Sequence, residues 1–116
     1  MQSDKEIVEF FNWAREYTVE DILKICSTDI LQNMENLQNL KSLDLSFKKL
    51  HSLPPYLFEL VSLENLNLSH NQLKELPKEI VKLKSLKNLD ISWNHIMHSL
   101  DFLPTNIKIN IAWNRK

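Results

Sequence analysis

The chain of 116 residues is long enough for one small domain, and its 14 basic and 15 acidic residues give a net charge of −1, which argues against a dedicated nucleic-acid binder. Glycine is absent, so the glycine-rich loops that hold phosphates or dinucleotides are excluded, and the single cysteine, Cys26, permits no intramolecular disulfide. The first residues are polar and acidic, and no apolar run approaches the ~18 residues of a membrane span. We therefore expect a cytoplasmic protein with no secretion signal and no membrane span.

Residues 3–17 predict an amphipathic helix. Ser3 and Glu6 have the spacing of a capping box. Trp13 flanks an apolar stripe that recurs every three or four residues, at Ile7, Phe10, Phe11, Ala14 and Tyr17. We expect this stripe to close the open apolar end of the segment that follows. A partner-binding helix is the alternative.

Residues 18–36 are compatible with two interpretations. Thr18 can cap a second short helix, and for residues 22–25 we favour this helix over a cap strand. The apolar spacing also fits the outer half of a degenerate repeat that begins near Ile30. Cys26 follows apolar residues, which predicts a buried thiol. Residues 1–36 are expected to form a helical N-terminal cap.

The predicted cap and the rest of the chain differ in charge. Residues 1–36 hold eight acidic and three basic residues, which gives −5. Residues 37–116 hold eleven basic and seven acidic residues, which gives +4. A dipolar protein of this kind can orient partners, although a solvated surface is the simpler interpretation.

From residue 37 an apolar skeleton returns with a period of 23 residues. The first copy has Leu40, Leu43, Leu45, Leu50, Leu53, Leu57 and Leu60; the second has Leu63, Leu66, Leu68, Leu73, Leu76, Ile80 and Leu83; the third has Leu86, Leu89, Ile91 and Ile96. A fixed period of this length is typical of a solenoid, in which each unit buries its apolar edge only against its neighbours. Pro54 and Pro77 follow the last inner leucine, where proline suits the first position of a short helical turn.

These copies resemble the leucine-rich repeat in its 23-residue form. The resemblance implies an α/β solenoid: a short leucine-rich repeat array with a concave parallel sheet, convex turns at 55–60 and 78–83, and the N-terminal helical cap. The third copy lacks the expected Leu-Pro, and alternation at Ile107, Ile109 and Ile111 marks a last strand 20 residues after Ile91. We expect about three and a half repeats in residues 37–116, no C-terminal cap, and a weak homodimer through the exposed last strand.

The resemblance also indicates which side chains line the concave face. Among its small polar positions we predict partner binding by Asp44, Asn67, Asp90 and Asn110. The position before the repeat asparagine holds one ring per repeat, at Phe47, His70, Trp93 and Trp113. Aromatic side chains at a solvent edge are frequent binding anchors, so we predict a recognition rim. The alternative is that these rings only stabilise each other.

Other polar residues are expected to be structural. Asn71, Asn94 and Asn114 take the repeat's asparagine position. The side-chain amide at this position forms hydrogen bonds with neighbouring backbone groups. Lys48 stands there in the first repeat and cannot accept a hydrogen bond. His95 and His98 lack the further ligands of a zinc site, and no catalytic or cofactor motif is present.

The sequence therefore predicts a non-enzymatic module that binds another protein or peptide by its concave face and aromatic rim. The alternative is a binder of nucleic acid or another anionic surface. It would use the lysines of one edge, at Lys74, Lys78, Lys82, Lys84 and Lys87. Glu75 and Glu79 interrupt these lysines and no aromatic residues interleave them, which makes this alternative the weaker one.

Overall fold

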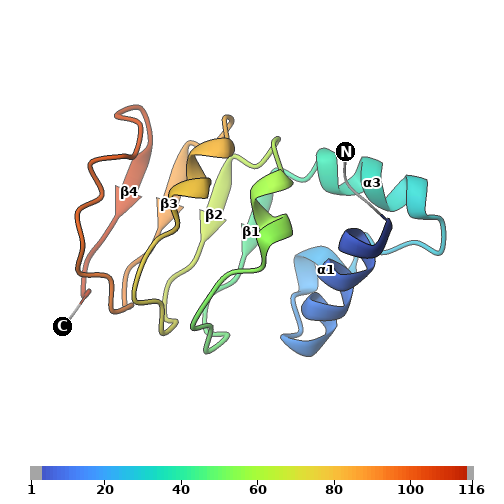
Figure 1. Ribbon diagram of the computed structural model, residues 1–116, viewed down its shortest axis with the longest axis horizontal. Coiled ribbons are helices and arrows are strands. Elements are labelled where there is room, and N and C mark those ends of the chain that lie inside the picture. Colours follow the sequence, from blue (N-terminus) through green and yellow to red (C-terminus); the bar gives the residue numbers. More distant parts are fainter. Residues whose placement is uncertain (1–3, 115–116) are drawn as a thin grey trace.

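The computed structural model describes residues 4–114 and arranges them as a short solenoid with helices at one end (Figure 1). The helices are α1 (Asp4–Glu16), α2 (Glu20–Leu23) and α3 (Ile30–Gln38). Four parallel strands follow in the order β1 (Ser42–Asp44), β2 (Asn65–Asn67), β3 (Asn88–Asp90) and β4 (Lys108–Asn110). Two 3₁₀ turns, η1 (Pro55–Glu59) and η2 (Lys78–Lys82), lie outside the sheet. The predicted α/β solenoid is confirmed.

The strand register follows directly from the repeat. Leu43 pairs with Leu66 and Leu66 with Leu89, which is the 23-residue period, and Leu89 pairs with Ile109, which is the shortened last unit. Because side chains alternate across a strand, this register sends the central leucine of β1, β2 and β3 and Ile109 of β4 inward, and their two neighbours toward the concave face. Equivalent side chains of successive repeats therefore stand side by side.

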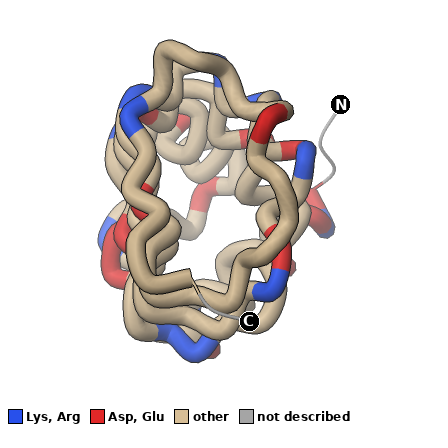
Figure 2. Tube along the Cα trace, turned by 90° about the vertical axis from the view of Figure 1, so that its left-hand side faces the viewer, with Lys and Arg blue, Asp and Glu red and all other residues tan. Residues whose placement is uncertain are grey.

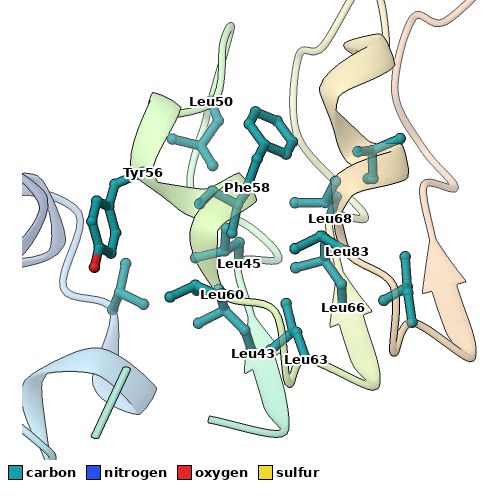
Figure 3. Close-up of a cluster of buried hydrophobic side chains, with 14 of the residues drawn as sticks. Leu43, Leu45, Leu50, Tyr56, Phe58, Leu60, Leu63, Leu66, Leu68 and Leu83 are labelled. Carbon is teal, nitrogen blue, oxygen red and sulfur yellow. The ribbon is translucent and has the colours of Figure 1, made fainter. Parts of the chain in front are cut away.

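The core is a continuous stack of leucines between the sheet and the 3₁₀ turns (Figure 3). Each of these side chains is at most 2 % exposed, and full burial of one contributes roughly 1.5–3 kcal/mol. The central members are Leu43, Leu45, Leu50, Leu60, Leu63, Leu66 and Leu68. Because each repeat packs only against its neighbours, stability is shared along the array.

The helical cap closes the first repeat as predicted. Helix α1 buries Ile7, Phe10, Phe11 and Ala14, and the Phe10 ring lies 5.2 Å from that of Tyr56 in η1. Helix α2 lies against β1, and one carboxylate oxygen of its Asp21 accepts the Asp44 backbone N–H at 2.8 Å. A side chain thus satisfies a donor at the edge of the sheet. Ser3, half of the expected capping box, lies outside the described residues.

Between α1 and α3 the structure corrects two expectations. Thr18 does not cap α2: it adopts a left-handed backbone with φ of 52°, and Val19 precedes the helix without a side-chain cap bond. Cys26 is exposed rather than buried. The physical reason is that α2 is a single turn ending at Leu23, so Cys26 lies beyond its buried face. Its sulfur lies 3.6 Å from a guanidinium nitrogen of Arg15.

Two boundaries also differ in detail. Helix α3 begins at Ile30, as the repeat spacing suggests, with Asp29 accepting the Leu31 N–H at 3.0 Å. It continues to Gln38, and the division into a cap of residues 1–36 and repeats of residues 37–116 stays a prediction. Pro54 and Pro77 have extended backbones one residue before η1 and η2, not the first helical position expected for them.

The other end of the described sheet is strand β4, which pairs with β3 alone. The weak homodimer expected through this strand stays a prediction. Within residues 4–114, no helix has the length and apolar character needed to cross a membrane.

Candidate functional site at the concave face and aromatic column

Asparagine side chains join neighbouring repeats beneath the candidate site. The Asn94 amide nitrogen donates to Leu68 O at 2.9 Å in the preceding repeat, and to two carbonyls of its own repeat. Its oxygen accepts the Leu73 N–H at 3.0 Å. Asn71 and Asn114 make equivalent bonds to their own neighbours. The predicted structural duty of these residues is confirmed.

Lys48, in the asparagine position of the first repeat, keeps half of that duty. Its ammonium donates to Thr18 O of the cap at 2.9 Å, just as each asparagine donates to the repeat before it. In the other repeats the asparagine oxygen accepts hydrogen bonds from backbone N–H groups of the preceding repeat. Because the helical cap stands in that place, a side chain that only donates is sufficient here.

The four predicted concave residues form a row that lines the surface. Their side chains also fix the backbone turn that ends each strand. Register places Asp44, Asn67, Asp90 and Asn110 side by side. In each, one side-chain oxygen accepts the backbone N–H two residues later, at 2.9 to 3.1 Å, which makes an Asx turn at the end of every strand. Among residues 4–114, the second carboxylate oxygens of Asp44 and Asp90 have no hydrogen-bond partner.

After each Asx turn comes an aromatic residue with a left-handed backbone. φ is 56° at Phe47, 55° at His70, 56° at Trp93 and 61° at Trp113. A side chain in this region costs about 1–2 kcal/mol, and the chain has no glycine to place there. The backbone N–H groups of Phe47, His70 and Trp93 donate to a carbonyl of the following repeat, at 3.0 to 3.2 Å. These bonds hold the conformation in place.

The four rings stack into one continuous aromatic column, here meaning Phe47, His70, Trp93 and Trp113. Centroid distances are 4.0, 5.3 and 5.0 Å along the column, and interplanar angles are 12° to 19°. The rings can stack because successive repeats are offset by the strand separation of about 4.8 Å, which is also a ring-stacking distance. Phe47, Trp93 and Trp113 are 71, 47 and 57 % exposed. Aromatic surface therefore remains open to solvent.

The sheet itself forms a shallow groove of about 430 Å³, which we call the concave groove. It is lined by the row of Asx-turn residues and by a second row in which Asn88 donates to Asn65 at 2.7 Å and Asn65 donates to Ser42 at 3.1 Å. Asp21 of the cap also lines it, with Lys108 among the β4 residues. The groove is therefore acidic toward the cap and carries its lysine at the far strand.

Several of the residues considered for other roles make local structural contacts. His98 accepts the Leu76 N–H at 3.1 Å through Nε2, so it holds the third repeat against the second. Among the described residues, no group of three or more His, Cys, Asp or Glu side chains is placed to hold a metal ion. Of the edge lysines, Lys82 lies 3.9 Å from Glu59 and Lys87 lies 3.9 Å from Glu64. Figure 2 shows basic and acidic residues interspersed around the coil.

Sequence reasoning placed the column and the concave row but missed two features of the site. It missed Asp21, whose place depends on how α2 packs against β1. It also missed the Asx turns, although a motif marks them: Asp or Asn, any residue, Ser or Ala, then an aromatic residue. The motif occurs at 44–47, 67–70, 90–93 and 110–113.

Comparison with known proteins agrees with this geometry. A family model described as leucine rich repeat matches residues 38–96, which span the first two repeats and about half of the third. No curated protein matches the chain.

Proposed function

Since the chain belongs to the leucine-rich repeat family, whose domains generally mediate protein–protein interaction without catalysis, we propose that it is a non-enzymatic module that binds an extended segment of a partner protein. The segment lies along the concave groove, and its apolar or aromatic side chains pack on the aromatic column. The observation that carries this proposal is the column itself. Three of its four side chains are among the large exposed hydrophobic residues, and all four are held in register.

The concave groove and the aromatic column offer complementary kinds of contact, one polar and one apolar. The groove offers amide, hydroxyl and carboxylate groups at regular spacing, which suit the backbone and polar side chains of an extended segment. The column offers exposed apolar ring surface that loses little conformational entropy on binding, because stacking already fixes the rings. Polar contacts then set the register of the segment, and the rings supply most of the binding free energy.

The charge of the groove favours one orientation of the segment. Asp44 and Asp90 each keep a carboxylate oxygen that is not engaged by the turn, and Asp21 adds a third acid near the cap, although Lys24 lies 3.3 Å from it. Lys108 lies on the last strand. We therefore expect bound segments to place basic residues toward β1 and acidic residues toward β4.

The test is selection from a phage-displayed library of random dodecapeptides on the immobilised chain. Enriched peptides are then titrated into ¹⁵N-labelled protein. The proposal predicts chemical-shift changes at β1–β4 and at the indole signals of Trp93 and Trp113. Enriched peptides whose shifts map to the 3₁₀ turns or to the cap, with the groove and column unaffected, would contradict it.

A second experiment tests the alternative that the chain binds nucleic acid or another anionic surface. Neutralising several phosphates releases counterions, so binding of RNA or DNA through the edge lysines must weaken steeply with salt. We expect a 20-nucleotide single-stranded RNA to be retained weakly or not at all. Tight retention that falls by orders of magnitude between low and physiological salt would favour the alternative.

A further inference from the structure

A second groove lies between the cap and the outer part of the first repeat. This cap groove has a volume of about 540 Å³ and lies between helix α1 and residues 51–56. It shares no lining residue with the concave groove. Tyr56 also lines it, and Figure 3 shows this side chain projecting from η1 toward the cap segments.

One face of helix α1 supplies the wall of the cap groove. Phe10, Trp13 and Tyr17 recur three and four residues apart, and their rings form a ladder with centroid distances of 5.7 and 5.5 Å. Phe10 is the buried member of the ladder, while Trp13 and Tyr17 are only partly buried. Partly exposed rings therefore face the groove opposite Leu53 and two prolines.

The cap groove is rich in acidic side chains. The described residues that line it include Glu6, Glu9 and one histidine, His51, but no lysine or arginine. Residues 4–36 around it carry eight acidic and three basic side chains. Burial, followed by the charges of Glu59 and Glu6, raises the pKa of Tyr56, which is consistent with a negative potential there.

We propose that the cap groove binds an extended segment of a partner protein centred on an arginine. The guanidinium stacks over the Trp13 and Tyr17 rings and reaches the carboxylates of Glu6 and Glu9. Arginine fits better than lysine because its planar group can stack on a ring and bond a carboxylate at the same time. Lys5 lies 3.9 Å from Glu9, but both side chains are mostly exposed, so this weak pair yields readily to a stacked guanidinium.

The size and lining of the groove favour a peptide over a small cation. A guanidinium alone fills only part of 540 Å³. Leu53, Pro54 and Pro55 extend an apolar surface beyond the acids, and this surface suits proline or leucine on either side of the arginine. The cap groove and the concave groove can therefore hold different segments, and each can be tested without the other.

The test uses a fluorescein-labelled heptapeptide, Pro-Leu-Pro-Arg-Pro-Leu-Pro, and the same peptide with citrulline, which keeps the shape of arginine without its charge. The full chain is titrated and followed by fluorescence anisotropy and by ¹⁵N spectra. We expect saturable shifts at the Trp13 indole and at the amides of His51 to Tyr56 other than the two prolines. The citrulline peptide should bind at least about tenfold more weakly, since it loses the charge-assisted bonds.

Two variants keep the result independent of folding. Glu6→Gln with Glu9→Gln removes both charges at exposed positions, retains the size of the side chains, and should also weaken binding by about tenfold or more. Leu31→Ser, at an exposed residue of α3 outside the groove, should leave it unchanged. Circular dichroism confirms that each variant is folded.

Several outcomes would overturn the proposal. One is the absence of a saturable shift at Trp13, and another is equal affinity for the citrulline peptide. A third is equal affinity for N-acetylarginine amide, which would show that the site binds a small cation rather than a peptide. Concentration-dependent shifts at Trp13 without peptide would assign the groove to a second copy of the chain. Shifts confined to the concave groove would refute the cap site and leave the concave proposal standing.

Discussion

The ring of Trp93 stacks on that of Trp113 at a centroid distance of 5.0 Å, and both residues have a left-handed backbone with φ of 56° and 61°. The stacking and the backbone are two parts of one arrangement. An Asx turn ends each strand, the next residue turns left-handed, and the strand spacing then brings successive rings into contact. Ring stacking offsets part of the conformational cost, since each pair contributes about 0.5–1.5 kcal/mol.

This coupling predicts an unusual order of stability for variants of Trp93. Both Trp93→Ala and Trp93→Gly lose the contacts with His70 and Trp113, which costs about 1–3 kcal/mol. Glycine tolerates the positive φ that alanine does not, so Trp93→Gly should be the more stable of the two by about 0.5–1 kcal/mol. Urea unfolding followed by circular dichroism measures the difference.

Met97 provides the control for this comparison. It is 59 % exposed and does not have a positive φ. There the usual order should hold, with Met97→Ala more stable than Met97→Gly. If alanine is also the more stable residue at position 93, the left-handed backbone is not what shapes the column.

Asn94 should be among the most sensitive polar residues. It is 2 % exposed and makes four hydrogen bonds to backbone groups of two repeats. Asn94→Ala leaves those groups without partners away from water, and we expect a loss of about 3 kcal/mol or more in the free energy of unfolding. Asn114→Ala, which removes similar bonds at a more exposed position, should cost less. A change at Asn94 within the ~0.5 kcal/mol typical of surface positions would be inconsistent with this role.

The two neighbouring histidines should behave differently. Nε2 of His98 accepts the N–H of Leu76, a residue 2 % exposed, whereas the His95 side chain is exposed and has no hydrogen bond among residues 4–114. His98→Ala should therefore lower the free energy of unfolding by about 1–2 kcal/mol, and His95→Ala should change it by no more than about 0.5 kcal/mol. Thermal melting of both variants checks this, and equal effects would argue against a structural role for His98.

Tyr56 should make stability depend on pH in the alkaline range. Its pKa is raised above 10.0 by burial and then by Glu59 and Glu6, so the folded state holds the phenol proton more tightly than the unfolded state. This contribution is fully present below pH 10.0 and is lost as pH rises through the higher folded-state pKa. Urea unfolding between pH 8 and pH 11 should therefore show a steeper fall for the wild type than for Tyr56→Phe. Parallel curves for the two proteins would show that Tyr56 does not contribute.

The features that were predictable from sequence are those fixed by the repeat. A period of 23 residues and an apolar skeleton determine which residues pair, so Leu43, Leu66 and Leu89 fell into register as expected. The column followed from the same counting, because stacked repeats bring equivalent positions together. Its left-handed backbone was not predicted, since none of these residues is glycine and only His70 is of a type enriched at positive φ.

The cap was less predictable because it has no period. Helical spacing located the buried face of α1, but it failed at Cys26, where the single turn of α2 had already ended. The cap groove was missed for a related reason. Trp13 and Tyr17 were assigned to a buried stripe or its flank, and only the packing of α1 against residues 51–56 leaves them partly exposed beside Glu6 and Glu9.

The central claim is that the aromatic column is a recognition surface, and its most direct test is the affinity of one variant for a concave-face peptide obtained by the selection described above. Trp93→Gly removes the ring with the smaller loss of stability, and Leu31→Ser removes an exposed apolar side chain elsewhere. Isothermal titration of the folded proteins should show binding weakened by about 2 kcal/mol or more for Trp93→Gly and unchanged for Leu31→Ser. Unchanged affinity of folded Trp93→Gly would mean that the rings serve only to stabilise the solenoid, and would contradict the account.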